Sequence, residues 1–335
     1  MIKGPGRLDV DHVAVPAIDA GDVLVAVDLC GICGSDLHMV LEGWGEPGSW
    51  HGHEWIGSVV AVGEDVERWR PGDQVVGGPS VRCGECAMCR AGRPSLCAER
   101  DAPGVGPEQG GFATYKRSPA EEVLAMPADL DPRAAALTEP LAVALHGINQ
   151  AKVQPGQRVL VMGAGPIGAL SIAALRASGV DDVSCVEPST ARRELASTVG
   201  ASRVLDPAEL AVTSIAHPGS IVEDAVDVVL ECSGKAEAME AGLAQLRRGG
   251  TLVLVGAGIE PPRFDPNRIL LNELVITGAF TYDHDGFERA LDMLASGSLP
   301  VDALLEPGDV PLTGVLDAMQ DLAAGRRAGK VLVRP

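Results

Sequence analysis

Four cysteines close together in the sequence place the strongest constraint on how this chain can fold. They follow the pattern C-x2-C-x2-C-x7-C and are Cys83, Cys86, Cys89 and Cys97. Thiolates at this spacing can supply a complete tetrahedral shell of sulfur ligands, which is typical of a structural zinc site. Two disulfides are the alternative, but they need an oxidising compartment, and the N-terminal residues do not resemble a secretory signal. The sequence therefore predicts a structural zinc ion in a lobe of about residues 80–100.

Composition and charge exclude several classes of partner. The 335 residues are enough for two domains, and 46% of them are hydrophobic, as in globular proteins. The formal net charge is −19, whereas binding to nucleic acid or an anionic membrane requires a basic surface. The longest apolar stretch, residues 159–175, is interrupted by glycine and proline and is shorter than the roughly 20 residues of a membrane-spanning helix. We expect a soluble, cytoplasmic protein with no nucleic-acid or membrane partner.

The hydrophobic pattern changes near residue 130. Before this point, β-branched runs bounded by turn residues, such as 23–27 and 57–63, predict a β-rich region. After it, segments with helical spacing alternate with buried strands, of which the first two are 158–162 and 182–186. This alternation predicts an α/β fold with a parallel, doubly wound sheet. Further strands are expected at 227–231, 250–255, 274–277 and 330–333, and helices at 134–145, 167–178, 191–199, 287–295 and 312–323.

A glycine-rich motif joins the first strand and the first long helix of the α/β region. It has the pattern G-x-G-x-x-G and consists of Gly163, Ala164, Gly165, Pro166, Ile167 and Gly168. We expect Gly163 to form a tight turn, Gly165 to let a pyrophosphate approach, and Gly168 to pack the helix against the strand. The helix start offers free N–H groups and a positive dipole end to the phosphates. The motif predicts a bound dinucleotide.

The residues after the second strand bear on which dinucleotide is bound. Glu187 ends that strand, where its carboxylate can accept hydrogen bonds from both adenosine ribose hydroxyls and repel a 2′-phosphate. This favours NAD over NADP. Arg192 and Arg193 follow closely and either contact the cofactor's phosphate or form a solvated helix face.

A second group of metal-binding residue types lies upstream of the four cysteines. Cys33 and His53 offer a thiolate and an imidazole, which are two of the three protein ligands of an open, catalytic zinc site. The third ligand is left open between Glu54, which is adjacent, and Glu139, which begins an apolar helix. Cys30 is a rival thiolate, but it closes a strand and is better explained as a small buried residue.

These motifs resemble those of the zinc-dependent medium-chain dehydrogenases, in particular the sorbitol and threonine dehydrogenase branch. The matching segments are G-I-C-G-S-D-L-H at 31–38, G-H-E-x2-G-x5-G at 52–63, the four-cysteine lobe, T-E-P-L-A at 138–142, G-A-G-P-I-G at 163–168 and G-K-V-L-V at 329–333. The resemblance spans essentially the whole chain. It implies a GroES-like β-rich catalytic domain at 1–146 and 280–335, with a Rossmann NAD-binding domain inserted at 147–279.

The resemblance also implies how the catalytic metal is held. Cys33 and His53 are expected as zinc ligands, and Glu139 resembles the third ligand of the polyol branch. Glu54 is expected to exchange on and off the metal. Asp36 is expected to hydrogen-bond His53 and fix its tautomer.

The activity implied is hydride transfer from a secondary alcohol, such as a polyol or sugar alcohol, to NAD. Ser35 and His38 are expected to carry the alcohol proton outward by way of the nicotinamide ribose. The family implies two zinc ions per chain, one catalytic and one structural, and a homodimer or homotetramer. An NADPH-dependent carbonyl reductase and a non-catalytic zinc-binding scaffold are the alternatives. Trp44, Trp50 and Trp55 are candidate walls of the substrate pocket.

Overall fold

The computed structural model describes residues 1–79, 82–99, 110–211 and 216–335. Residues 80, 81 and 100 of the predicted lobe lie outside this part. The chain divides into two compact units, the first being Met1–Pro140, Asp283–Gly297 and Leu305–Pro335, and the second Leu141–Tyr282 and Ser298–Leu304. The first unit thus contains both ends of the chain. Within the described residues, no helix has both the length and the hydrophobicity needed to cross a bilayer.

The first unit is built on a mostly antiparallel sheet with the strand order β14-β15-β3-β4-β5-β7, and β6 also pairs with β3. Its strands are β1 (Ile2–Gly4), β2 (Arg7–Leu8), β3 (Asp22–Gly31), β4 (Glu54–Val62), β5 (Gln74–Gly77), β6 (Tyr115–Pro119), β7 (Leu124–Ala125), β14 (Val310–Pro311) and β15 (Leu332–Arg334). Its helices are α1 (Gly34–Leu41), α2 (Ala87–Arg90), α3 (Pro132–Ala135), α9 (Gly286–Ala295), α11 (Val315–Ala323) and the start of α4 (Thr138–Ala151).

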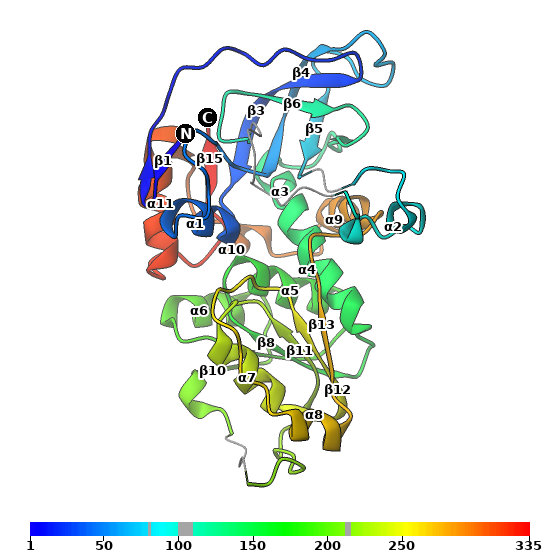
Figure 1. Ribbon diagram of the computed structural model, residues 1–335, viewed down its shortest axis with the longest axis vertical. Helices are drawn as coiled ribbons and strands as arrows, with labels where there is room; N and C mark the ends of the chain where they lie inside the picture. Colours follow the sequence, from blue (N-terminus) through cyan, green and yellow to red (C-terminus); the bar gives the residue numbers. More distant parts are fainter. Residues whose placement is uncertain (80–81, 100–109, 212–215) are drawn as a thin grey trace. The chain divides into compact units, whose positions relative to one another are not determined.

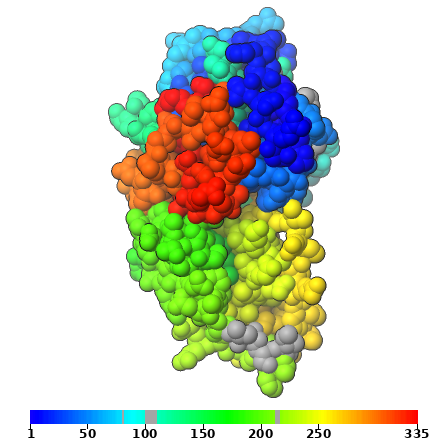
Figure 2. Space-filling view, turned by 90° about the vertical axis from the view of Figure 1, so that its left-hand side faces the viewer, coloured from blue at the N-terminus to red at the C-terminus, as the bar shows by residue number. Residues whose placement is uncertain are grey.

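Two apolar clusters stabilise this unit. One lies against the sheet, where every second residue of β3 from Val23 to Val27 is buried, as expected for a strand with one face on the core. The other joins distant parts of the chain, since Ile2 packs with Met319 and Val333. Figure 2 shows this side of the unit, with the N-terminal residues in blue beside the C-terminal residues in red.

The second unit is a six-stranded parallel sheet with the order β10-β9-β8-β11-β12-β13 (Figure 1). Its strands are β8 (Arg158–Met162), β9 (Asp182–Val186), β10 (Arg203–Leu205), β11 (Val226–Glu231), β12 (Leu246–Leu254) and β13 (Val275–Gly278). Its helices are α5 (Pro166–Ala177), α6 (Thr190–Thr198), α7 (Ala236–Ala244), α8 (Pro266–Asn272) and α10 (Val301–Leu304). Helix α5 packs on β8 and β9, and α7 packs on β11 and β12. The chain runs outward from β8 to β10 and then returns to β11 on the other side of β8. The predicted doubly wound topology is therefore confirmed.

Some elements differ from their predicted extents. The apolar segment 134–145 forms two helices rather than one, because Asp131 caps α3 and the hydroxyl of Thr138 bonds the carbonyl of Ala135 where α4 begins. The segment 312–323 starts with a 3-10 turn before α11. The compact units also differ from the expected domain limits, since 141–146, 280–282 and Ser298–Leu304 group with the second unit.

Candidate active site

The proposed metal-binding residues of the first unit meet because two paired strands end at the same edge. In the antiparallel pair β3–β4, Gly31 is opposite Glu54, so Cys33 follows one strand end and His53 precedes the other. Ligand atoms of Cys33, His53 and Glu54 all lie within 4.8 Å of one another. A thiolate, an imidazole and a carboxylate are suitable donors for Zn²⁺. Glu139, in the first turn of α4, does not join this group in the structure, although it is buried nearby.

Glu54 has a buried partner that the sequence analysis assigned no role. The ammonium group of Lys330 donates to both carboxylate oxygens of Glu54, each at 2.6 Å, and to the carbonyl of Ile32 at 3.0 Å. Both side chains are buried, at 1% and 0% exposure. A Cβ atom at Gly31 would lie 2.1 Å from a carboxylate oxygen of Glu54, so this close approach requires glycine. The sequence did contain a signal of this ion pair. Lys330 lies inside the apolar run G-K-V-L-V, and a charge buried in such a run needs a partner.

The charges around the site favour a cation. Burial raises the pKa of Glu139 to about 7, and the neighbouring Glu54 carboxylate also raises it. Burial alone lowers the pKa of His53, but the Cys33 thiolate and the Asp36 carboxylate raise this pKa well above its ordinary value. The negative charge of these groups therefore exceeds the positive charge that Lys330 supplies. This donor set fits a divalent metal ion.

Asp36 fixes the geometry at the start of α1. One of its carboxylate oxygens accepts a hydrogen bond from the backbone N–H of Cys33 at 2.9 Å, and the other lies 3.8 Å from Nδ1 of His53. Cys33 is the N-cap residue of this helix. The cap therefore holds the Cys33 main chain, and the same buried carboxylate lies beside the imidazole.

Ser35 and His38 lie three positions apart on α1 and therefore on one face of it. Within the described part of the chain, no residue hydrogen-bonds the Ser35 hydroxyl. Nδ1 of His38 lies 2.6 Å from the Glu42 carboxylate, and its ring stacks on Trp44 with centroids 4.9 Å apart. Glu42 was not predicted from the sequence, although its i, i+4 spacing from His38 was visible there.

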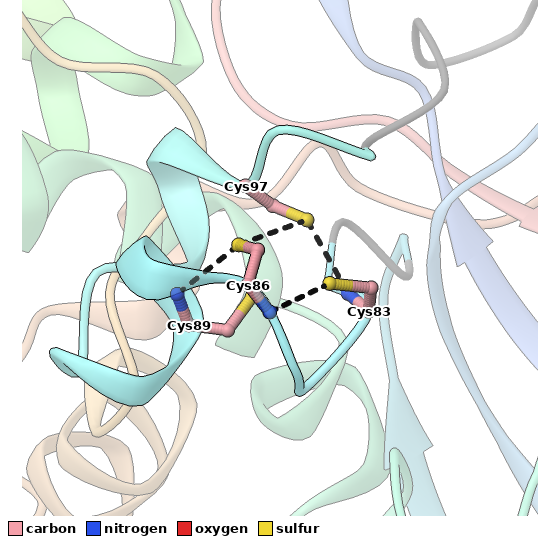
Figure 3. Close-up of side chains that lie close together, drawn as sticks. All are labelled: Cys83, Cys86, Cys89 and Cys97. Atoms are coloured by element: carbon pink, nitrogen blue, oxygen red, sulfur yellow. Dashed lines mark hydrogen bonds between the residues drawn. The ribbon is translucent and has the colours of Figure 1, made fainter.

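The four lobe cysteines gather as the spacing predicted. Their ligand atoms lie within 4.8 Å of one another, and the side chains of Cys83, Cys86, Cys89 and Cys97 converge in Figure 3. Backbone N–H groups donate to the sulfurs, and such bonds from Cys89 and Ala98 lower the pKa of Cys86 to about 6. All eight cysteines of the chain lie in its described part, and none is disulfide-bonded. Burial raises the pKa of Cys89 to about 11, so of these two thiols Cys86 alone is shifted toward thiolate without a metal. The convergence of four sulfurs without a disulfide fits a tetrahedral zinc ion.

In the second unit, the glycine motif has the geometry of a pyrophosphate cradle. Gly163 has a φ of 92°, in the left-handed region that favours glycine. A Cβ at Gly168 would lie 1.9 Å from the carbonyl oxygen of Gly163, so helix α5 can pack this closely only with glycine. A Cβ at Gly165 would meet nothing within 4 Å, so the space in front of the α5 N-terminus is open. These features fit a dinucleotide.

The carboxylate of Glu187 is buried and joined to this turn. It accepts hydrogen bonds from the N–H groups of Ala164 at 2.8 Å and Ser189 at 2.9 Å. Arg193 binds the carbonyl of Glu187 and the carboxylate of Asp206, each through the guanidinium group. Arg193 is thus held by the protein, which favours a structural role for it.

The remaining candidates separate by burial. Trp55 is 1% exposed and belongs to the apolar core, which favours a structural role over a pocket wall. Trp44 is 45% exposed and stacks on His38, while Trp50 lines a cavity of about 250 Å³ beneath the N-terminal residues 8–16. Cys30 is fully buried, and burial raises the pKa of its thiol well above the ordinary value. This agrees with its interpretation as a small core residue.

Comparisons with known proteins agree with this fold and site. The family model of the alcohol dehydrogenase GroES-like domain matches residues 19–128, and that of the zinc-binding dehydrogenases matches residues 166–296. The fold and the site thus define an oxidoreductase of the alcohol dehydrogenase class. The chain belongs to the zinc-dependent medium-chain dehydrogenases, the family of alcohol and polyol dehydrogenases. The family resemblance predicted from the motifs is confirmed.

Individual relatives cover nearly the whole chain. A sorbitol dehydrogenase of Bacillus subtilis is 33% identical over 98% of this chain and 94% of its own length. A zinc-binding dehydrogenase of Sinorhizobium meliloti, solved with NADP, is 32% identical with a TM-score of 0.86, covering 99% and 97% of the two chains. A dehydrogenase of Escherichia coli, solved with NADH, is 28% identical with a TM-score of 0.89, covering 100% and 98%. Zinc and a nicotinamide cofactor are therefore the groups that this family uses.

Proposed function

We propose that this enzyme oxidises a secondary alcohol, such as a polyol or sugar alcohol, with NAD as the hydride acceptor. The observation that carries the proposal is the convergence of Cys33, His53 and Glu54 at the start of α1, the helix that contains Ser35. The sorbitol dehydrogenase relative supports a polyol as the substrate class. The open space at Gly165 supports a bound dinucleotide.

Cys33 and His53 would hold the catalytic zinc together with one carboxylate. We assign the resting third ligand to Glu139. Lys330 already balances the charge of Glu54, whereas burial raises the pKa of Glu139 to about 7, so the Glu139 carboxylate needs a nearby cation to stay ionised. Glu54 would then be the exchanging group. When bound, zinc lowers the pKa of a coordinated hydroxyl group, and the nicotinamide ring accepts the hydride.

The side chains of α1 would remove the alcohol proton. Ser35 Oγ would accept this proton, and the His38 ring, on the same face of α1, would carry it on toward solvent. The contact between His38 Nδ1 and Glu42 holds the ring in place and makes Glu42 an acceptor on the way to solvent. The protein thus supplies orientation and a path for the proton.

A substrate panel tests the proposed function. Polyols, cyclitols, amino alcohols and simple alcohols are each incubated with the zinc-loaded enzyme and NAD, and NADH formation is followed by absorbance. The expected result is turnover confined to secondary alcohols, with polyols the best. Absence of turnover in this direction, together with reduction of ketones by NADPH, would instead support a carbonyl reductase. Absence of turnover in both directions would support the non-catalytic scaffold.

Cofactor choice is expected to depend on the charge of Glu187. The carboxylate repels a 2′-phosphate, so Glu187→Gln should narrow the ratio of kcat/KM between NAD and NADP by at least about tenfold. Glutamine removes the charge and keeps an acceptor for one of the two N–H groups that Glu187 binds, those of Ala164 and Ser189. Glu194→Gln removes the same charge at an exposed position on α6. This control variant should leave the ratio of kcat/KM unchanged. A wild-type preference for NADP would contradict the assignment and would instead favour Arg192 as a ligand of the 2′-phosphate.

Two zinc ions per chain are expected, one in each cysteine-containing site. Cys89→Ser should lower the zinc content from about two ions to about one and reduce the thermal stability, because structural zinc contributes directly to folding. Elemental analysis and a thermal melt measure both effects. Met88→Ser, at an exposed neighbour in the same lobe, should retain both ions. Full zinc content in Cys89→Ser would show that Cys89 is not a ligand.

We also propose that the enzyme is a homodimer or a dimer of dimers, located in the cytoplasm. Strand β13 is at one edge of the second unit's sheet, and large apolar side chains are exposed around it, namely Ile259, Leu270, Leu271, Val275 and Phe280. Pairing of two β13 edges would bury them. Sedimentation analysis of the wild type and of Val275→Lys tests this, and a monomeric wild type would contradict it.

The proposed cytoplasmic location rests on the cysteines. The eight free thiols support a reducing compartment.

A further inference from the structure

A buried carboxylate in the second unit has no part in the function proposed above. Glu231 ends strand β11 and is 0% exposed. Its side chain accepts hydrogen bonds from the N–H and the hydroxyl of Ser233, at 2.7 and 2.5 Å, and from the N–H of Gly234, at 3.1 Å to each oxygen. Burying a charged group is costly unless it is hydrogen-bonded. These three donors therefore indicate that the carboxylate holds this loop in one conformation.

The same residue also fixes a second loop. The carbonyl oxygen of Glu231 accepts the N–H groups of Val255 and Gly256, at 2.8 and 2.9 Å, where strand β12 ends. The two loops pack main chain on main chain, because a Cβ at Gly234 or at Gly258 would lie 1.9 Å from a carbonyl oxygen of the other loop. No side chain separates them, so the first loop, which the Glu231 side chain holds, directly supports the second.

These loops lie where the second half of a dinucleotide must pass. The strand order reverses between β8 and β11, and ligands of such sheets bind at the carboxyl edge of this switch point. The glycine motif follows β8 and Glu187 follows β9, so the pyrophosphate and adenosine would occupy that side. The nicotinamide nucleoside must then extend over the ends of β11 and β12. The loop after β11 also touches the motif, since a Cβ at Gly163 would lie 2.9 Å from Ser233 Cβ.

We propose that Glu231 is a positioning residue that holds the loops 232–234 and 255–258 in the shape that receives the nicotinamide nucleoside. This rests on the proposed use of a nicotinamide dinucleotide. Glu231 is fully buried and bonded to the first loop, so it would act through the main chain of the loops.

The test compares two ligands that differ at one end. ADP contains the adenosine and pyrophosphate, whereas NADH also contains the nicotinamide nucleoside. In Glu231→Leu, the side chain offers no acceptor for the N–H groups of Ser233 and Gly234 or for the Ser233 hydroxyl, so the loops should shift. We expect the Kd for NADH to rise at least about tenfold, equivalent to about 1.4 kcal/mol, while the Kd for ADP changes less than about twofold. Isothermal titration calorimetry of the zinc-loaded enzyme measures both values.

Glu187→Gln is the control at the opposite end, and it should change the two Kd values by the same factor. Ser233→Ala removes only one hydrogen bond to Glu231, so a smaller rise for NADH alone is expected. This variant carries the test if Glu231→Leu does not fold. Equal effects on both ligands, or no effect on NADH, would overturn the proposal. A wild type that binds neither ligand would instead contradict the proposed function, on which the inference depends.

Discussion

Ser35→Ala is expected to lower turnover at least about a hundredfold while the affinity for NAD stays nearly intact, since loss of an acid–base group typically costs 10²–10⁴-fold in rate. Loss of a helix cap would instead cost about 1 kcal/mol of stability with little kinetic effect. The structure argues against a capping role, because α1 is capped by Cys33 and Asp36, and Ser35 lies within its first turn. Steady-state kinetics and a thermal melt on the same preparation separate the two roles.

Two further variants sharpen this test. Ser35→Thr keeps a hydroxyl at the same position and should retain most of the activity. His38→Ala should cost less than Ser35→Ala and should recover partly at high pH, where solvent base can replace the imidazole. Near-normal turnover in Ser35→Ala, with or without a lower melting temperature, would remove Ser35 from the proton path.

Lys330→Met is expected to destabilise the first unit by about 3–5 kcal/mol, because it leaves the Glu54 carboxylate buried without its partner. Burial alone lowers the pKa of Lys330, but Glu54 raises it above its ordinary value, so the lysine is charged and the pair is ionic. Urea unfolding followed by tryptophan fluorescence measures the effect in this unit specifically. All four tryptophans, which are Trp44, Trp50, Trp55 and Trp69, lie within it.

The double variant Lys330→Met/Glu54→Gln distinguishes loss of the ion pair from loss of packing. Removing both charges should recover a large part of the lost stability, because no unpaired charge then remains buried. Lys3→Met is a matched control at a partly exposed ion pair with Asp11 and should change the unfolding free energy little. If Lys330→Met is as stable as the wild type at saturating zinc, the pair does not stabilise the fold.

Local sequence patterns were sufficient for most of the fold. The β-branched runs before residue 130 and the later alternation of strands and helices correctly predicted a β-rich part and a doubly wound sheet. Element limits were less accurate where a single side chain decides them, as at Thr138, whose hydroxyl bond to Ala135 marks where α4 begins. Periodicity extends across such a break and cannot reveal it.

The sequence by itself determined the parts of the site whose ligands are close together in the chain. The four lobe cysteines and the glycine motif carry their geometry in their spacing, because a short loop leaves few ways to arrange its side chains. Only the tertiary structure decided which distant residues meet them. Lys330 reaches Glu54 across 276 positions, and Glu231 joins two loops that follow different strands. No spacing rule connects such residues, since their contact depends on how whole strands pack, and packing is a property of the folded chain.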